Sequence, residues 1–257
     1  MAAAIQTRPT TRASMDATRK TAFVAGILYI VTFISIPTLG LYHSVLNNHQ
    51  YITHVGSNSS VLSGAFLELI VALAGIGTAV VLFPVVKRQN EAAALGFVTS
   101  RVIEGAMIFV GVLSLLSLVT LRHDMAGTSG ADAASLVTTG RALAATYKWT
   151  FLFGQTLMPA INALLLGSLL YRSRLVPRIL PTLGLIGAPI LILSVVVAMF
   201  RINHPVTVLA ALGTLPVAAW EFSLGVWLVV KGFNPCPLTD APLPGRDPER
   251  EVLSAGA

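Results

Sequence analysis

Apolar residues fill six long stretches of this 257-residue chain, and short polar segments separate them. A helix needs about 20 predominantly apolar residues to cross a bilayer, and each stretch reaches that length. The stretches start near Thr21, Val61, Ala92, Thr150, Val176 and Val206 and end near Tyr42, Val86, Leu121, Tyr171, Phe200 and Val230. The pattern therefore predicts an all-α polytopic transmembrane helical bundle with six spans.

Polar segments at both ends of the chain lie outside the predicted spans. Residues 1–20 form a basic arm and residues 234–257 form a tail. Neither segment carries an apolar run that would order it against a core, so we expect both to be disordered. Residues 21–233 then form a single membrane domain.

The longest connection between spans has a helical pattern of its own. The following residues fall on one helical face: Leu136, Val137, Gly140, Leu143, Ala144 and Tyr147. We therefore predict an amphipathic helix near residues 130–148 that lies on the outer interface of the bilayer. A lid over an outward-facing cavity is the alternative.

Charge patterning sets the expected orientation. Most of the 17 Lys and Arg residues lie in the arm, in the connections after the second and fourth spans, and in the tail. The opposite side holds Arg122, Arg141, Lys148 and Arg201. Because basic residues favour the cytoplasmic side of a membrane, we expect both termini to be cytoplasmic.

Composition changes how the net charge of +6 is interpreted. A strongly basic protein is a candidate for nucleic-acid binding, but only 11% of these residues are charged and 54% are hydrophobic. An ordinary soluble domain carries roughly a quarter charged residues. We therefore expect the lipid bilayer as the surroundings and no nucleic-acid partner; the oligomeric state is left open.

Several polar residues interrupt the apolar spans at similar depths. At about 1.5 Å per residue from the end expected to be cytoplasmic, Arg101, Asn162 and Glu221 lie about 13 Å deep and Glu104 about 18 Å deep. The hydrocarbon layer is about 30 Å thick, so these four residues share its midplane. Two more candidates lie in the outer halves of their spans and could line an approach from outside: Glu68 and Gln155.

Arg101 requires a partner, because an unpaired charge at the bilayer centre costs at least about 2.5–3.5 kcal/mol. Glu104, one helical turn away, is the local candidate, and Glu221 on another span is the distant one. If both glutamates are ionised, the group carries one excess negative charge. A proton, a cation or a cationic ligand would balance it, or one carboxyl stays protonated and the group only joins helices.

Three segments resemble a known family: "GIGTAVVLFPVVKRQNEAAALGFVTSRVIEGAMI", "INALLLGSLLYRSRLVPRILPTLGLIG" and "AWEFSLGVWLVVKGF". They are similar to the bacterial integral membrane family named domain of unknown function 4386, and the similarity runs from about Lys20 to Phe233. The resemblance implies a multi-pass protein of the bacterial cytoplasmic membrane. It implies no activity, so no catalytic residue follows from it.

These features favour one function over two others. A proton- or cation-linked transporter of a small molecule would use the midplane carboxylates as titrating groups. The alternative is a noncatalytic membrane module that binds and regulates a partner protein or a lipid. An enzyme is disfavoured, because the chain has neither an H-E-x-x-H nor a G-x-S-x-G motif.

We also expect neither a metal nor another cofactor. All five histidines lie on the side expected to be outer, but their spacing matches no metal motif: His43, His49, His54, His123 and His204.

Overall fold

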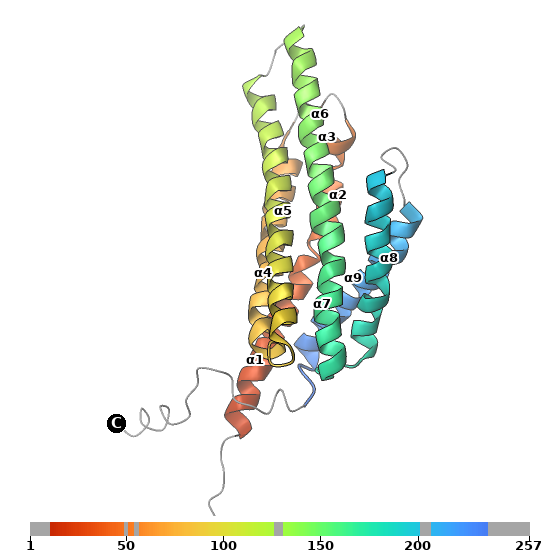
Figure 1. Cartoon of the computed structure of the whole chain (residues 1–257). Coiled ribbons are helices and arrows are strands. Elements are labelled where there is room, and N and C mark those ends of the chain that lie inside the picture. The colour runs from red at the N-terminus through yellow and green to blue at the C-terminus, as the bar shows by residue number, and fades with distance from the viewer. Residues whose placement is uncertain (1–10, 49–50, 54–56, 126–130, 201–206, 236–257) are drawn as a thin grey trace, which may run out of the picture.

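The computed structural model describes residues 11–48, 51–53, 57–125, 131–200 and 207–235. Every regular element in this part of the chain is helical, as Figure 1 shows. The elements are α1 (Thr11–Thr32), α2 (Ser35–Leu41), α3 (His43–Asn47), α4 (Ser59–Val86), α5 (Glu91–Asp124), α6 (Ala131–Phe151), η1 (Leu152–Leu157), α7 (Met158–Ser173), α8 (Ile179–Phe200) and α9 (Thr207–Val230). Six helical segments are long and apolar enough to cross a membrane, so the predicted all-α six-span fold is confirmed.

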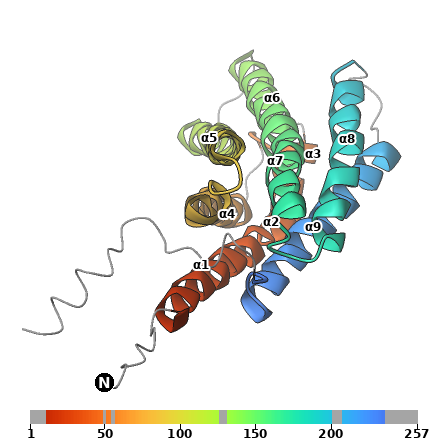
Figure 2. The ribbon, with the colours of Figure 1, turned by 60° about the horizontal axis from the view of Figure 1, so that its bottom comes forward.

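The spans form a closed ring. Along the ring, α1 packs against α4, α4 against α5, and α5 against α7; α7 then packs against α8, α8 against α9, and α9 against α1. Figure 2 shows α4 and α5 on one side of the molecule and α8 and α9 on the other, with α7 between them. Side chains from non-adjacent spans can therefore meet inside the ring.

The first span is broken. Helix α1 ends at Thr32, and a turn at Phe33 and Ile34 separates it from α2. Helix α1 also begins at Thr11, so the expectation that the whole arm 1–20 is disordered was wrong for residues 11–20; residues 1–10 lie outside the described part. An arginine near the start of α1 contacts the last span. This part of the helix therefore has a tertiary partner, which a local sequence pattern does not reveal.

That arginine is Arg19, which caps the carboxyl end of α9. Its Nη1 donates to the carbonyl oxygen of Leu228 at 2.9 Å, and its Nη2 donates to those of Val229 at 2.7 Å and Val230 at 3.2 Å. The last carbonyl groups of a helix lack partners within the helix and carry partial negative charge, so a cation stabilises them. The described ends of the first and last spans therefore lie on the same side of the bundle.

The segment expected to lie flat on the outer interface instead continues the fourth span. Asp132–Ser173 is one helical run of 42 residues, about 63 Å long at 1.5 Å per residue. It contains α6, η1 and α7, and α6 packs along α5. Since a bilayer core is only about 30 Å thick, α5 and α6 project beyond it, as their tops do beyond α8 in Figure 1.

Glycines bring α8 and α9 into close contact. A Cβ atom placed on Gly184 would lie 2.7 Å from Cδ1 of Trp220, and one on Gly187 would lie 2.8 Å from Cβ of Pro216. Helix α8 continues without a break past Pro189. These glycines therefore serve close packing, which agrees with the preference for small residues where membrane helices meet.

Candidate functional site

Arg101 lies inside the ring with a carboxylate on either side. Its Nη1 donates to Oε2 of Glu104 at 3.0 Å and to Oε1 at 3.2 Å, within the same helix α5. Its Nη2 donates to Oε1 of Glu221 on α9 at 2.5 Å. Both partners expected from the sequence are present, so one guanidinium joins two helices that are not neighbours in the ring.

Two further features surround this ion cluster. The Arg101 Cζ atom lies 5.3 Å from the centroid of the Tyr29 ring and 5.8 Å from that of Phe97, within the range of cation–π attraction. The Nδ2 of Asn162 on α7 donates to Oε2 of Glu104 at 2.6 Å. Four spans thus contribute to the cluster through α1, α5, α7 and α9.

Two buried polar atoms of the cluster have no hydrogen-bond partner among the described residues: Nε of Arg101 and Oδ1 of Asn162. Buried polar groups in proteins are nearly always paired with protein groups, water or a ligand. Both residues bond to the Glu104 carboxylate through their other polar atoms.

A second cluster surrounds Glu68 on α4. Its Oε1 accepts from the hydroxyl of Tyr147 at 2.9 Å and from Nε2 of Gln155 at 2.9 Å, and its Oε2 accepts from the hydroxyl of Tyr42 at 3.2 Å. The Tyr42 and Tyr147 rings meet edge to face at 5.2 Å. Neutral donors therefore surround this carboxyl group, which is only 1% exposed.

Gln155 lies in η1, a short π-helical segment between α6 and α7. Such segments shift the side chains of one turn relative to an α-helix and are frequent at functional sites. Here the shifted turn carries a residue that donates to Glu68 and also lines a cavity with Arg101 and Glu104. Gln155 thus connects the two polar clusters.

The cavity has a volume of about 490 Å³ and lies between the break in the first span, α5, η1, α8 and α9. Its charged lining residues, among those that the structure describes, are Arg101, Glu104 and Glu221. Apolar side chains such as Phe33, Leu191 and Val217 form much of the remaining wall. The cavity therefore has one charged end and an otherwise mainly apolar surface.

The comparisons with known proteins yield one family. The family model described as "Domain of unknown function (DUF4386)" matches residues 24–232, which include most of the first span and all of the other five. The chain belongs to this family. No curated protein and no solved structure matches it.

Within this DUF4386 chain, the six candidate residues form two bonded groups, one around Arg101 and one of Glu68 with Gln155. Arg101, Glu104, Asn162 and Glu221 meet at one depth, whereas Glu68 lies outside the cavity lining and reaches it only through Gln155. Sequence reasoning missed Tyr29 and Tyr42. Tyr29 could have been found from the sequence, because its position in the first span puts it about 12 Å deep, close to the depth of Arg101.

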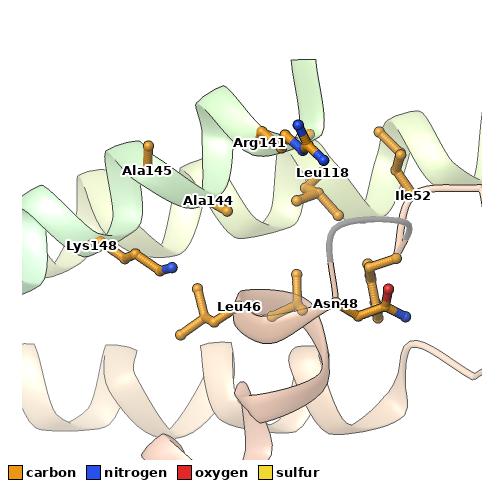
Figure 3. A pocket seen from close by; sticks show the side chains of 11 residues that line it. Leu46, Asn48, Ile52, Leu118, Arg141, Ala144, Ala145 and Lys148 are labelled. Carbon is orange, nitrogen blue, oxygen red and sulfur yellow. The ribbon is translucent and has the colours of Figure 1, made fainter. Parts of the chain in front are cut away.

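A smaller pocket of about 260 Å³ lies near the projecting ends of α5 and α6, on the side away from Arg19. In Figure 3, the Lys148 side chain extends from α6 toward the side of the pocket where Leu46 lies, and Arg141 lies farther along α6 beside Leu118. Both cations are exposed, and neither has an ion-pair partner among the described residues.

The expected absence of a metal site is not contradicted over the described residues, which contain no group of three or more His, Cys, Asp and Glu side chains suited to an ion. Of the five histidines, His49, His54 and His204 lie outside the described part. His123 contacts Asp124 at 3.3 Å on the surface.

Proposed function

We propose that this protein is a proton- or cation-linked carrier of a small molecule, acting in the bacterial cytoplasmic membrane with both termini in the cytoplasm. One observation supports the proposal above all. The charges that line the central cavity are one guanidinium and two carboxyl groups, so the ionised group is one positive charge short of neutral. A mobile cation or proton restores neutrality, and its exchange is a means of coupling.

Glu221 is the better candidate for the exchanging group. Its side chain is 14% exposed, slightly more than the 11% of Glu104, and it lines the cavity with one ion pair, to Arg101. Glu104 accepts from both Arg101 and Asn162, so groups of the protein already occupy its carboxylate. We therefore assign the exchangeable proton or cation to Glu221.

The first prediction is a pH-dependent stability that requires Glu221. If the folded cluster holds an extra proton, the folded state binds more protons than the unfolded state, so stability falls as pH rises through the range in which that proton leaves. The slope reaches about 1.4 kcal/mol per pH unit for one proton. Thermal unfolding of the purified protein across pH measures it, with Glu221→Gln beside the native chain.

Glu91→Gln is the matched control, because Glu91 is an exposed carboxylate at the start of α5. We expect Glu91→Gln to keep the native pH dependence of thermal stability and Glu221→Gln to lose it. A flat native profile combined with a large loss of stability in Glu221→Gln would instead identify Glu221 as a fixed partner of Arg101. Flux of protons or cations in liposomes then tests the carrier itself.

The pocket in Figure 3 supports a second candidate, a module that binds and regulates a partner protein or a lipid. Arg141 and Lys148 provide unpaired positive charge among the described residues, and both lie on α6, one of the two helices that extend past the bilayer core. An acidic partner or an anionic headgroup matches that charge. A copurifying partner, together with no flux in liposomes, would favour this function over the carrier.

A further inference from the structure

The wall of the central cavity includes side chains that are themselves on the outer surface of the bundle. Ile36 and Leu39 on α2 are 61% and 50% exposed, and Leu215 on α9 is 68% exposed. A residue that both lines a cavity and faces outward marks the edge of an opening. The cavity therefore opens sideways, between α2 and α9.

The depth of this opening places it within the hydrocarbon layer. Ile36 follows Thr21 by 15 residues and Leu215 precedes Val230 by 15 residues, so each lies about 22 Å from the same end of its span. The hydrocarbon layer is about 30 Å thick. Acyl chains, and not water, therefore face the opening.

The break in the first span accounts for the opening. Helix α1 packs against both α4 and α9, but after the turn at Phe33 and Ile34 the chain continues as α2, which packs against α4. The wall between the first and last spans is consequently interrupted in the half of the membrane beyond the turn. Thr32, Phe33 and Ser35 around the turn line the cavity.

We propose that the cavity binds an amphiphilic organic cation, which enters sideways from the bilayer through the opening between α2 and α9. This inference rests on the proposed role of the cavity as a ligand site, and it names the class of ligand. The cationic group belongs beside Glu221 and Glu104, where the described charges sum to one negative charge. The apolar body belongs against Phe33, Leu191 and Val217.

Size and polarity agree with this ligand class. Pockets that bind drug-sized molecules have volumes of about 300–1,000 Å³ and are mostly apolar with a few placed polar groups. The cavity, at about 490 Å³, falls in this range. A soluble ion alone would gain nothing from the apolar wall, and an uncharged lipid would leave the negative charge unmatched.

The test uses two probes of nearly equal shape and opposite charge, tetraphenylphosphonium and tetraphenylborate. Equilibrium binding of each radiolabelled probe is measured with the full chain in nanodiscs, and empty nanodiscs give the background. We expect saturable binding of tetraphenylphosphonium alone, and roughly tenfold weaker binding to Glu221→Gln, since the lining charge then sums to zero. Equal or tighter binding of tetraphenylborate overturns the inference and needs no variant.

A second variant tests the route of entry. Leu215→Trp places a larger side chain at the edge of the opening and should slow release of bound tetraphenylphosphonium by at least about fivefold, because the route is narrowed. Leu73→Trp is the control: Leu73 is 62% exposed on α4 at a similar depth and does not line the cavity. Equal release rates in the two variants would refute sideways entry.

The outcomes separate this inference from the proposed function. If stability depends on pH through Glu221 but tetraphenylphosphonium does not bind, the proton-linked site is supported and the organic-cation ligand is refuted. If tetraphenylphosphonium binds selectively and stability does not change with pH, the ligand class is supported and the proton linkage is refuted. A copurified acyl chain that tetraphenylphosphonium does not displace from the cavity also overturns the inference.

Discussion

Arg101 is the residue on which the centre of the protein depends. Its guanidinium is 2% exposed and contacts carboxylates on two helices as well as two aromatic rings. A buried ion pair is weak evidence for net stability, because desolvation offsets much of the attraction. Removing one partner is costly all the same, since it leaves the opposite charge buried and unmatched.

This asymmetry gives a prediction for Arg101→Met. In the native background the substitution should lower the free energy of unfolding by about 3–5 kcal/mol, because Glu104 and Glu221 lose their cation. In a chain that already carries Glu104→Gln and Glu221→Gln, the same substitution should cost much less. Denaturant unfolding of the four proteins measures both steps, and equal losses would mean that Arg101 contributes through packing alone.

The sequence predicts only those contacts of this site that a local pattern of residues indicates. Arg101, Glu104 and Glu221 are charged residues in apolar runs at similar depths, so their meeting follows from helix geometry. The role of Gln155 depends on the π-helical turn, which no residue type in η1 specifies. The cavity depends on the break in the first span; Pro37, which cannot donate to the carbonyl oxygen of Phe33, marks that break, but no local pattern indicates the cavity beside it.

At the scale of the helices, small residues decide how closely neighbours approach. Gly184 lies against the indole of Trp220, a fully buried side chain between α8 and α9. In a bilayer the helices gain little from hydrophobic burial against each other, so packing contacts carry more of their association. The pair α8 and α9 should therefore be sensitive to a single added methyl group.

We predict that Gly184→Ala destabilises the protein by about 1–3 kcal/mol, as overpacking of a tight interface does. The added Cβ would lie 2.7 Å from Cδ1 of Trp220, which a rigid ring cannot accommodate without a shift. Gly96→Ala on α5 is the control, because its Cβ would lie 3.6 Å from Leu165, an ordinary contact. Comparable unfolding temperatures for the two variants would contradict this account of the interface.

That a segment is helical was predictable over most of the chain. How the helix near residues 130–148 lies relative to the membrane was not. The one-face pattern of Leu136, Gly140 and Tyr147 identifies a helix correctly, but an amphipathic face can meet either a membrane surface or another protein segment. Here it meets protein: Gly140 contacts Ile52, and the Tyr147 hydroxyl bonds to Glu68. Those partners are distant in the sequence, so the local pattern does not distinguish the two arrangements.

At the scale of the whole molecule, the ring closes where the first span meets the last. Arg19 donates to three successive carbonyl oxygens at the end of α9, across more than 200 residues of sequence. Gly232 follows with φ of 78°, in the left-handed region that favours glycine, and its position lies against the Arg19 side chain. The contact joins the two ends of the membrane domain.

We predict that Arg19→Met loosens this closure by about 0.3–1 kcal/mol, the range for an exposed cation at a helix carboxyl end. Hydrogen exchange of the amides of Lys231 and Gly232, which both donate to the carbonyl of Trp227, should become faster. Lys20→Met is the control, because Lys20 is the adjacent cation, is exposed and forms no ion pair within the described residues. Unchanged exchange in Arg19→Met would show that the cap does not hold the ring.

The Arg19 cap also has a consequence for the order in which the protein is made. A ribosome produces the first span early and the carbonyl groups of Leu228, Val229 and Val230 more than 200 residues later. Until then the guanidinium has no α9 to bind, and the five earlier spans form an open arc. A chain that lacked the end of its last span would leave the Arg19 guanidinium without these three acceptors, so this closure of the ring depends on the last span being made.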